Sequence, residues 1–196
     1  MKLQRLLLSL LVFAALSAPL FALEEKQKSR DLIYTFIGPV VTGGFNYLYH
    51  SDWFSDKNQQ EQRDYTGSFV SGGFIISIFM DQFTGDFSMQ YMHNFNEPGE
   101  LYHLFYTVNG KWLWKVSQPF HITMGLGLYF ETPPSNEDYN GAAGGQIPIG
   151  GVWNATFDTK LVFDFFVRYG FFGLGEYSSK LSYGLSVAFV FKVGRI

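Results

Sequence analysis

The sequence predicts an all-β protein, an eight-stranded antiparallel up-and-down transmembrane β-barrel. Three observations lead to this prediction. Large apolar residues alternate with small or polar residues along most of the chain, as in strands with two different faces. The composition is 19% aromatic and 16% charged, yet the mean hydropathy is only +0.03, so the hydrophobicity is dispersed. The connections between the alternating segments are by turns long and short.

The N-terminal segment has the features of a secretory signal peptide. Lys2 and Arg5 are followed by an almost wholly apolar run from Leu6 to Leu16, and small residues lead to Ala22. The apolar run is shorter than the ~20 residues that a spanning helix needs. We therefore expect a signal peptide over residues 1–22 and a barrel domain over 23–196.

Two early segments, 32–49 and 65–80, are apolar and rich in glycine, and their alternation is blurred. Residues 32–51 carry no charged side chain, but Gly38-Pro39 and Gly43-Gly44 disfavour a membrane helix there. We expect both segments to be strands. Their predicted outward residues are Ile37, Val41, Phe45, Tyr47, Tyr49, Val70, Phe74, Ile76 and Ile78.

Six later segments alternate more clearly and complete the count of eight strands. They cover residues 86–92, 101–116, 120–131, 146–154, 160–171 and 181–193. Asn109-Gly110 is a typical hairpin signal inside the second of them. A turn there would give nine strands, whereas bacterial barrels have an even number, so we expect one continuous strand through 101–116.

The connections fall into two classes, which places them at opposite ends of a meander. Long ones are expected near 50–64, 95–100, 131–145 and 173–179, and short ones near 81–85, 117–119 and 157–159. Outer-membrane barrels combine long loops at one end with short turns at the other. This rhythm supports an up-and-down topology.

The width of the apolar face indicates a membrane barrel. The lumen of an eight-stranded barrel barely holds ordinary side chains, so the many large residues must face outward. Water disfavours so large an apolar surface, whereas lipid accepts it, and closure leaves no backbone group unpaired. With the signal peptide, this predicts the outer membrane of a diderm bacterium and contact with outer-membrane lipid.

The opposite face then lines the lumen, and aromatic residues near strand ends form girdles. The predicted lumenal polar network, with both signs of charge available for ion pairs, is Asp86, Gln90, His103, Lys111, Lys115, His121, Asp164, Arg168 and Lys192. The predicted girdle consists of Tyr47, Tyr49 and Trp53 at the loop side and Trp112 and Trp114 at the turn side.

The pattern resembles the small outer-membrane β-barrel proteins, a group that includes the OmpA transmembrane domain, OmpX and OmpW. It rests on the signal peptide, the eight alternating segments and the final strand from Leu181 to Phe191. The resemblance implies insertion by the barrel assembly machinery, although Phe191 is followed by five further residues where the family commonly ends in Phe. OmpW-like members imply passage of small hydrophobic solutes. Surface-exposed loops are open to a host ligand, which the sequence does not identify.

We therefore expect an integral outer-membrane barrel that is structural or passes small solutes. A secreted lipid-binding barrel of lipocalin type is the alternative from another class. A lipid A-modifying enzyme is a further alternative, because His93 lies in a segment faintly like that of a deacylase, but position 95 is Phe rather than Ser and no nucleophile is evident.

We accordingly expect no enzymatic activity. The net charge of −3 leaves no basic footprint for nucleic acid. Cysteine is absent and the four histidines are scattered, so we expect no metal site and no cofactor. A side-chain-filled lumen predicts no porin-like channel. Pro39 and Pro148 each remove a ladder donor, which suggests a lateral exit for apolar solutes.

Overall fold

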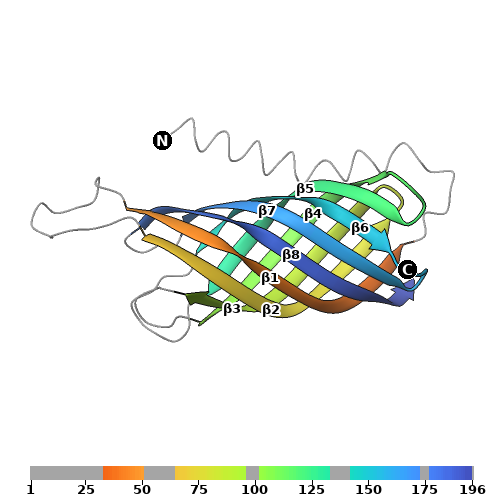
Figure 1. The fold of residues 1–196 in the computed structure, drawn as a ribbon, viewed down its shortest axis with the longest axis horizontal. Coiled ribbons are helices and arrows are strands. Elements are labelled where there is room, and N and C mark those ends of the chain that lie inside the picture. The colour runs from red at the N-terminus through yellow and green to blue at the C-terminus, as the bar shows by residue number, and fades with distance from the viewer. Residues whose placement is uncertain (1–32, 51–64, 96–101, 133–141, 173–176, 196) are drawn as a thin grey trace, which may run out of the picture. The chain divides into compact units, whose positions relative to one another are not determined.

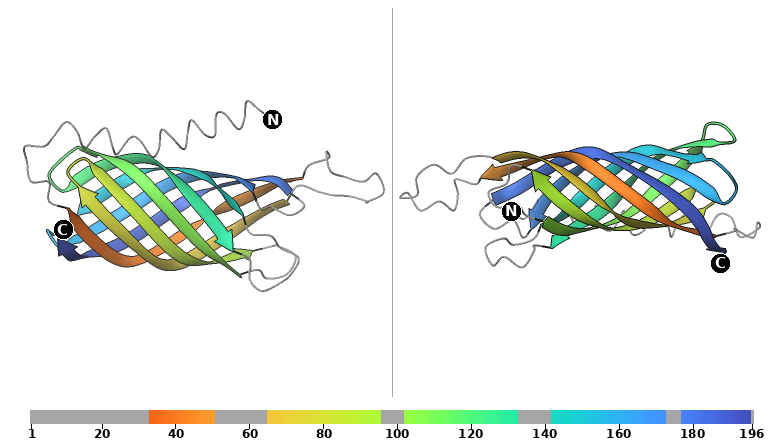
Figure 2. Two further views of the ribbon diagram at one scale, coloured as in Figure 1. Left: turned by 180° about the vertical axis from the view of Figure 1, so that it is seen from behind. Right: turned by 60° about the horizontal axis from the view of Figure 1, so that its bottom comes forward.

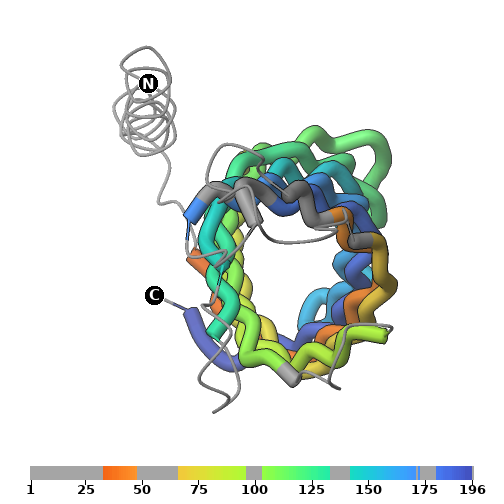
Figure 3. The backbone as a smooth tube through the Cα atoms, turned by 90° about the vertical axis from the view of Figure 1, so that its left-hand side faces the viewer, coloured from red at the N-terminus to blue at the C-terminus, as the bar shows by residue number. Residues whose placement is uncertain are grey.

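The computed structural model describes residues 33–50, 65–95, 102–132, 142–172 and 177–195. These residues form a closed barrel of eight strands, each paired with the next, and β8 closes the ring against β1. The tilted strands run around the whole circumference (Figures 1 and 2), and the view along the barrel shows a complete ring (Figure 3). The strands are β1 Tyr34–His50, β2 Tyr65–Met80, β3 Phe83–Phe95, β4 Tyr102–Lys115, β5 Phe120–Thr132, β6 Ala143–Asn154, β7 Thr159–Phe172 and β8 Tyr177–Arg195.

The predicted fold class is confirmed, and all eight strand pairs are antiparallel. The strand β4 runs without a turn through Asn109 and Gly110, as expected. Short turns follow β2, β4 and β6, and we call this the turn end of the barrel; the opposite end is the loop end. Among the described residues, no helix is long and apolar enough to cross a membrane.

Strand boundaries differ from the expectation at three connections. The connection expected as long over 173–179 spans only residues 173–176, because β7 ends at Phe172 and β8 begins at Tyr177. The segment expected as a loop over 131–145 is shorter, because β5 continues to Thr132 and β6 begins at Ala143. The turn after β2 is also tighter than expected, since β3 begins at Phe83. In all three places the pairing of backbone groups extends beyond the clear alternation of side chains, so the pattern marks strand centres better than strand ends.

The two faces of the wall are as predicted. Outward side chains are exposed and mostly large and apolar, for example Phe74 at 69% and Leu185 at 63% of their surface. Inward side chains of the same strands are buried, and they include Phe105, Tyr129 and Phe166. The exterior of this barrel is therefore its apolar surface, the reverse of a soluble protein.

The lumen is less polar than the sequence predicted. An apolar cluster fills the turn end: Phe36, Val40, Ile75, Phe79, Leu113, Val152, Val162, Ala188 and Val190. A second, more aromatic cluster occupies the loop end: Phe69, Met92, Phe105, Tyr129, Ala142 and Phe166. The blurred alternation of β1 and β2 has its cause here, because the inward residues of these strands at the turn end are as apolar as the outward ones.

Candidate functional site

The centre of the lumen holds three charged side chains in direct contact, which we call the ion triad: Asp86, Lys111 and Asp164. The Nζ of Lys111 lies 2.6 Å from Oδ2 of Asp86 on the adjacent strand and 2.8 Å from Oδ2 of Asp164 on β7, across the lumen. Lys111 is fully buried. Buried charges persist only when they are paired and hydrogen-bonded, so one lysine holds two carboxylates in place here.

Two hydroxyls complete the ion triad. Thr84 donates to Oδ1 of Asp86 at 3.3 Å, and Thr123 donates to Oδ1 of Asp164 at 3.4 Å. Four strands, β3, β4, β5 and β7, thus contribute to one polar contact set. This set ties opposite walls of the barrel together.

Arg168 is a second buried cation, and it is held in a different way. Its guanidinium carbon lies 3.6 Å from the ring centroid of Phe166 and 4.2 Å from that of Phe105, which is favourable cation–π geometry. Its Nε donates to Oε1 of Gln146 at 2.7 Å, and Gln146 in turn donates to Asn109. Among the described residues, no carboxylate is paired with Arg168.

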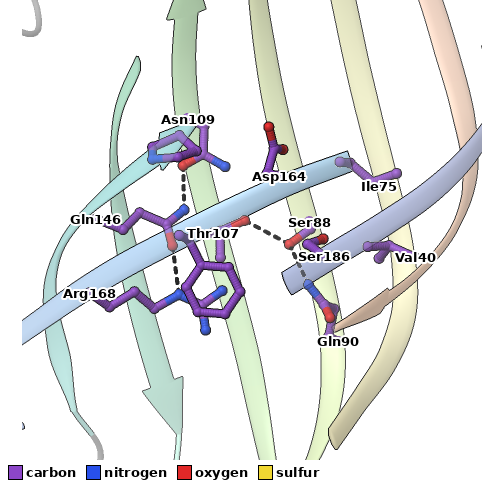
Figure 4. A pocket seen from close by; sticks show the side chains of 12 residues that line it. Val40, Ile75, Ser88, Gln90, Thr107, Asn109, Gln146, Asp164, Arg168 and Ser186 are labelled. Atoms are coloured by element: carbon purple, nitrogen blue, oxygen red, sulfur yellow. Dashed lines mark hydrogen bonds between the residues drawn. The ribbon is translucent and has the colours of Figure 1, made fainter. Parts of the chain in front are cut away.

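A small cavity lies beside Arg168 and Asp164 and is lined mainly by polar groups (Figure 4). Ser88 and Thr107 share a hydrogen bond of 2.7 Å, and Gln90 donates to Ser88 at 3.1 Å and accepts from Ser71 at 2.8 Å. The cavity offers about 20 Å³ to water, which is room for about one molecule. It is therefore about the size of a single hydration site.

The loop end of the lumen contains an ion pair that the sequence analysis missed. Lys180 of β8 lies 2.7 Å from Oε2 of Glu131 on β5, and both side chains are almost fully buried. Both residues fall on the inward parity of their strands, but each lies beside a segment expected as a loop. Continuing the alternation of β5 and β8 to their ends would have placed them in the lumen.

The predicted lumenal residues are brought together in part. Of these, Asp86, Gln90, His103, Lys111, Asp164 and Arg168 are buried. Lys192 and His121 are half-buried at the turn end. Lys115 differs from the expectation: it has the inward parity but is exposed, because β4 ends at this residue and its side chain lies at the mouth.

The turn-side part of the predicted aromatic girdle is on the outer face. Trp112 is half-buried and Trp114 exposed, and the ring of Phe83 packs edge-on against Trp112 at 6.5 Å. On the same end, Phe120 and Phe163 stack at 6.0 Å. Tyr47 is half-buried on β1, while the side chain of Tyr49 and all of Trp53 lie outside the described residues, as does the predicted signal peptide.

No group of three or more histidine and acidic side chains among the described residues is arranged to hold a metal ion. His93 is half-buried on the outer face, and the ring of Phe95 packs edge-on against it at 4.6 Å. The ion triad joins β3, β4 and β7 across the lumen.

Comparison with known proteins places the fold. The crystal structure of Neisserial surface protein A matches with a TM-score of 0.54 at 12% identity, over 82% of this chain and 97% of that one. OprG, an outer membrane protein from Pseudomonas aeruginosa, matches with a TM-score of 0.46 at 14% identity, over 82% of this chain and 96% of that one. Ail, the attachment invasion locus protein of Yersinia pestis, gives 0.38 at 12% identity, over 81% and 99%.

At these identities the likeness concerns the fold, and the match to Neisserial surface protein A carries it. No family model matches the sequence. No curated protein matches it either. The chain therefore has the fold of a small eight-stranded outer-membrane barrel.

Proposed function

We propose that this protein is an integral outer-membrane barrel with a closed lumen, a membrane-spanning body whose three longest connections lie at one end. The observation that carries the proposal is the apolar exterior. Side chains such as Phe74, Val41 and Leu185 are largely exposed, and each would be solvated by water in a soluble protein. At about 25 cal/mol per Å² of apolar surface, a belt around the whole barrel strongly favours lipid.

The same observation disfavours a secreted lipid-binding barrel. A lipocalin-type protein keeps its apolar residues inside, around a ligand cavity. Here the loop-end lumen is closed by packed rings such as Phe105 and Phe166, and the polar cavity has room for about one water molecule. A lipid would find no space in it.

The test is fractionation followed by gel mobility. Expressed with its N-terminal segment, the protein should sediment with outer membranes, require detergent for extraction, and migrate faster on unboiled than on boiled gels. Recovery in the periplasmic fraction without detergent, or the absence of a mobility shift, would overturn the proposal.

A closed lumen implies that the protein does not conduct as a porin does. The turn-end cluster, the ion triad and the Glu131–Lys180 pair lie one after another along the lumen. In planar bilayers the purified protein should show small or rare current events. Large, steady, ohmic steps would disprove a closed lumen.

A lateral path for small apolar solutes is the second candidate function, and breaks in the strand ladders favour it. The β1–β8 ladder lacks partners at Gly38 and Pro39, and the β5–β6 ladder lacks them at Ile147 and Pro148. At the first break a Cβ on Gly38 would overlap the carbonyl oxygen of Phe189, so the two strands remain in contact. The β5–β6 break at Pro148, which also lines the cavity, is the better candidate.

Restoring the backbone N–H donor that proline lacks at position 148 tests this path. Cells that express the parent protein should take up an apolar fluorescent dye such as N-phenyl-1-naphthylamine faster than cells with Pro148→Ala, whereas Pro39→Ala should behave like the parent. Equal uptake by parent, Pro148→Ala and an empty-vector strain would rule the path out.

We also infer that the protein is not an enzyme. A deacylase of the type considered above pairs its histidine with a side-chain hydroxyl that serves as the nucleophile. The position two residues after His93 is occupied by Phe95, whose ring packs against the imidazole. Incubation of the purified protein with lipid A should leave its acyl chains intact, and release of a fatty acid that depends on His93 would contradict the inference.

A further inference from the structure

The turn end of the lumen is surrounded by basic side chains, which we call the turn-end rim: Lys115, His121, Lys160 and Lys192. They come from four strands, β4, β5, β7 and β8, and all occupy inward-parity positions at the strand ends. Lys115 stands directly opposite His121 in the β4–β5 register. Lys160 stands opposite Val190, which places Lys192 at the diagonal position of the next strand.

These basic groups lie close enough to act on one another. Lys115 and His121 are directly opposed in the β4–β5 register, and Lys160 and Lys192 are diagonal neighbours on β7 and β8. Directly opposed and diagonal neighbours on one sheet face are about 5–8 Å apart, and like charges at such positions are destabilising. The fold therefore accepts a repulsive arrangement of Lys160 and Lys192 at this mouth.

Elsewhere in the lumen, buried lysines are neutralised by carboxylates in direct contact, but this neutralisation is weak at the turn-end rim. Lys160 lies over the rings of Phe36 and Phe79 at 5.0 and 5.1 Å and donates to the amide oxygen of Asn154. Lys192 lies over the rings of Tyr34 and Phe157. Among the described residues, the carboxylate paired with the rim is that of Asp158, which is 71% exposed and 3.7 Å from Lys192.

The contrast with the interior is informative. Lys111 and Lys180 each contact carboxylates at 2.6 to 2.8 Å. By contrast, Lys160 rests on two aromatic rings and a neutral amide, and Lys192 on two rings with the exposed Asp158 at 3.7 Å. Aromatic rings orient an ammonium group without neutralising it. The rim thus keeps its positive charge available at the mouth of the lumen.

We propose that the turn-end rim binds a soluble polyvalent oxyanion that carries several phosphate groups. Several ammonium groups from different strands suit a ligand with several separated charges, since lysine acts as a point-charge donor to phosphate. The inward parity of the four residues directs them toward the barrel axis and away from the lipid-facing surface. This favours a dissolved ligand at the mouth over lipid headgroups around the barrel.

The experiment uses the full chain, refolded in a non-ionic detergent, and inorganic tripolyphosphate as the probe. Isothermal titration should show binding of one equivalent that weakens as sodium chloride rises from 50 to 200 mM. The triple variant Lys115→Gln, Lys160→Gln and Lys192→Gln should abolish this binding. The affinity for tripolyphosphate should fall about tenfold for each ammonium group that contacts the anion. The matched control, Lys57→Gln, removes one positive charge from a long connection and should bind like the parent.

Two further arms make the outcome decisive. Asp158→Asn removes the acidic partner without removing a basic group, and it should tighten binding about two- to threefold. Parent barrels in vesicles of neutral lipid should bind tripolyphosphate as they do in detergent. Absence of binding, equal binding by the triple variant, or binding that appears only when anionic lipid is present would each overturn the proposal.

Discussion

Lys180 on β8 contacts both carboxylate oxygens of Glu131 on β5, at 3.0 and 2.7 Å, across the loop end of the lumen. The two strands are not neighbours in the barrel, so the contact joins opposite walls. Tyr129, two residues before Glu131 on the same face, is also fully buried. The ion pair and the tyrosine together close the lumen at this end.

Neutralising one partner of this pair should destabilise the barrel. Either Glu131→Gln or Lys180→Met leaves a buried charge without its counter-charge, which costs about 3–5 kcal/mol. The measurement is the free energy of unfolding in urea for barrels refolded into lipid vesicles. The double variant Glu131→Leu with Lys180→Met, which removes both charges, should recover most of the loss. Single variants as stable as the parent would show that the pair does not hold the walls together.

The ring of Tyr129 needs a glycine at position 170. A Cβ added to Gly170 would overlap the tyrosine hydroxyl, while the next nearest atoms, in Lys180 and in the ring, lie at 3.4 and 3.5 Å. Gly170→Ala should therefore cost about 1–3 kcal/mol by overpacking. The measurement is again unfolding in urea.

A second substitution separates this clash from a general effect of losing glycine. The Tyr129 hydroxyl has no hydrogen-bond partner among the described residues, so Tyr129→Phe alone should change stability little. Gly170→Ala in the Tyr129→Phe background should then be nearly neutral. An equal cost of Gly170→Ala in both backgrounds would contradict this account.

Arginine on the lipid-facing surface should destabilise the barrel according to its depth. Phe165 and Leu185 are exposed, outward and mid-strand, so Phe165→Arg or Leu185→Arg should each cost about 2–4 kcal/mol in a bilayer. Val116 is also exposed but lies beyond the end of β4, and Val116→Arg should cost under about 1 kcal/mol. Equal costs at all three positions would mean that the outer face is not in lipid.

The alternation of side chains predicted the faces of the wall, because parity alone decides whether Asp86, Lys111 or Arg168 points inward. Parity does not decide which inward residues meet. Lys111 reaches Asp164 across the lumen because the two residues lie at the same level along the barrel axis. That level depends on strand tilt and register stagger, which are properties of the closed ring. The cross-lumen pairs therefore had to come from the structure.

The apolar turn end was missed for a different reason. Phe36, Val40, Ile75 and Phe79 point inward and are buried, yet their neighbours in sequence are apolar as well and point into lipid. When both faces of a strand are apolar, alternation disappears, and the segment can equally be assigned to a buried helix. Pairing partners on β1, β2 and β8 resolve what the local sequence leaves open.

The ion triad gives the last prediction, which separates its structural role from a role in closing the lumen. Lys111→Met would leave the carboxylates of Asp86 and Asp164 buried without a cation, and should cost about 3–5 kcal/mol. Asp164→Asn should cost less, because the contact of 2.6 Å between Lys111 and Asp86 remains. Replacing all three, with Asp86→Asn and Asp164→Asn added to Lys111→Met, should recover part of the loss. Urea unfolding in vesicles gives these values.

In planar bilayers the triple variant should still lack steady, ohmic steps, because the apolar clusters at both ends of the lumen are unchanged. Steady conduction by that variant would show that the triad, and not the packed clusters, closes the barrel.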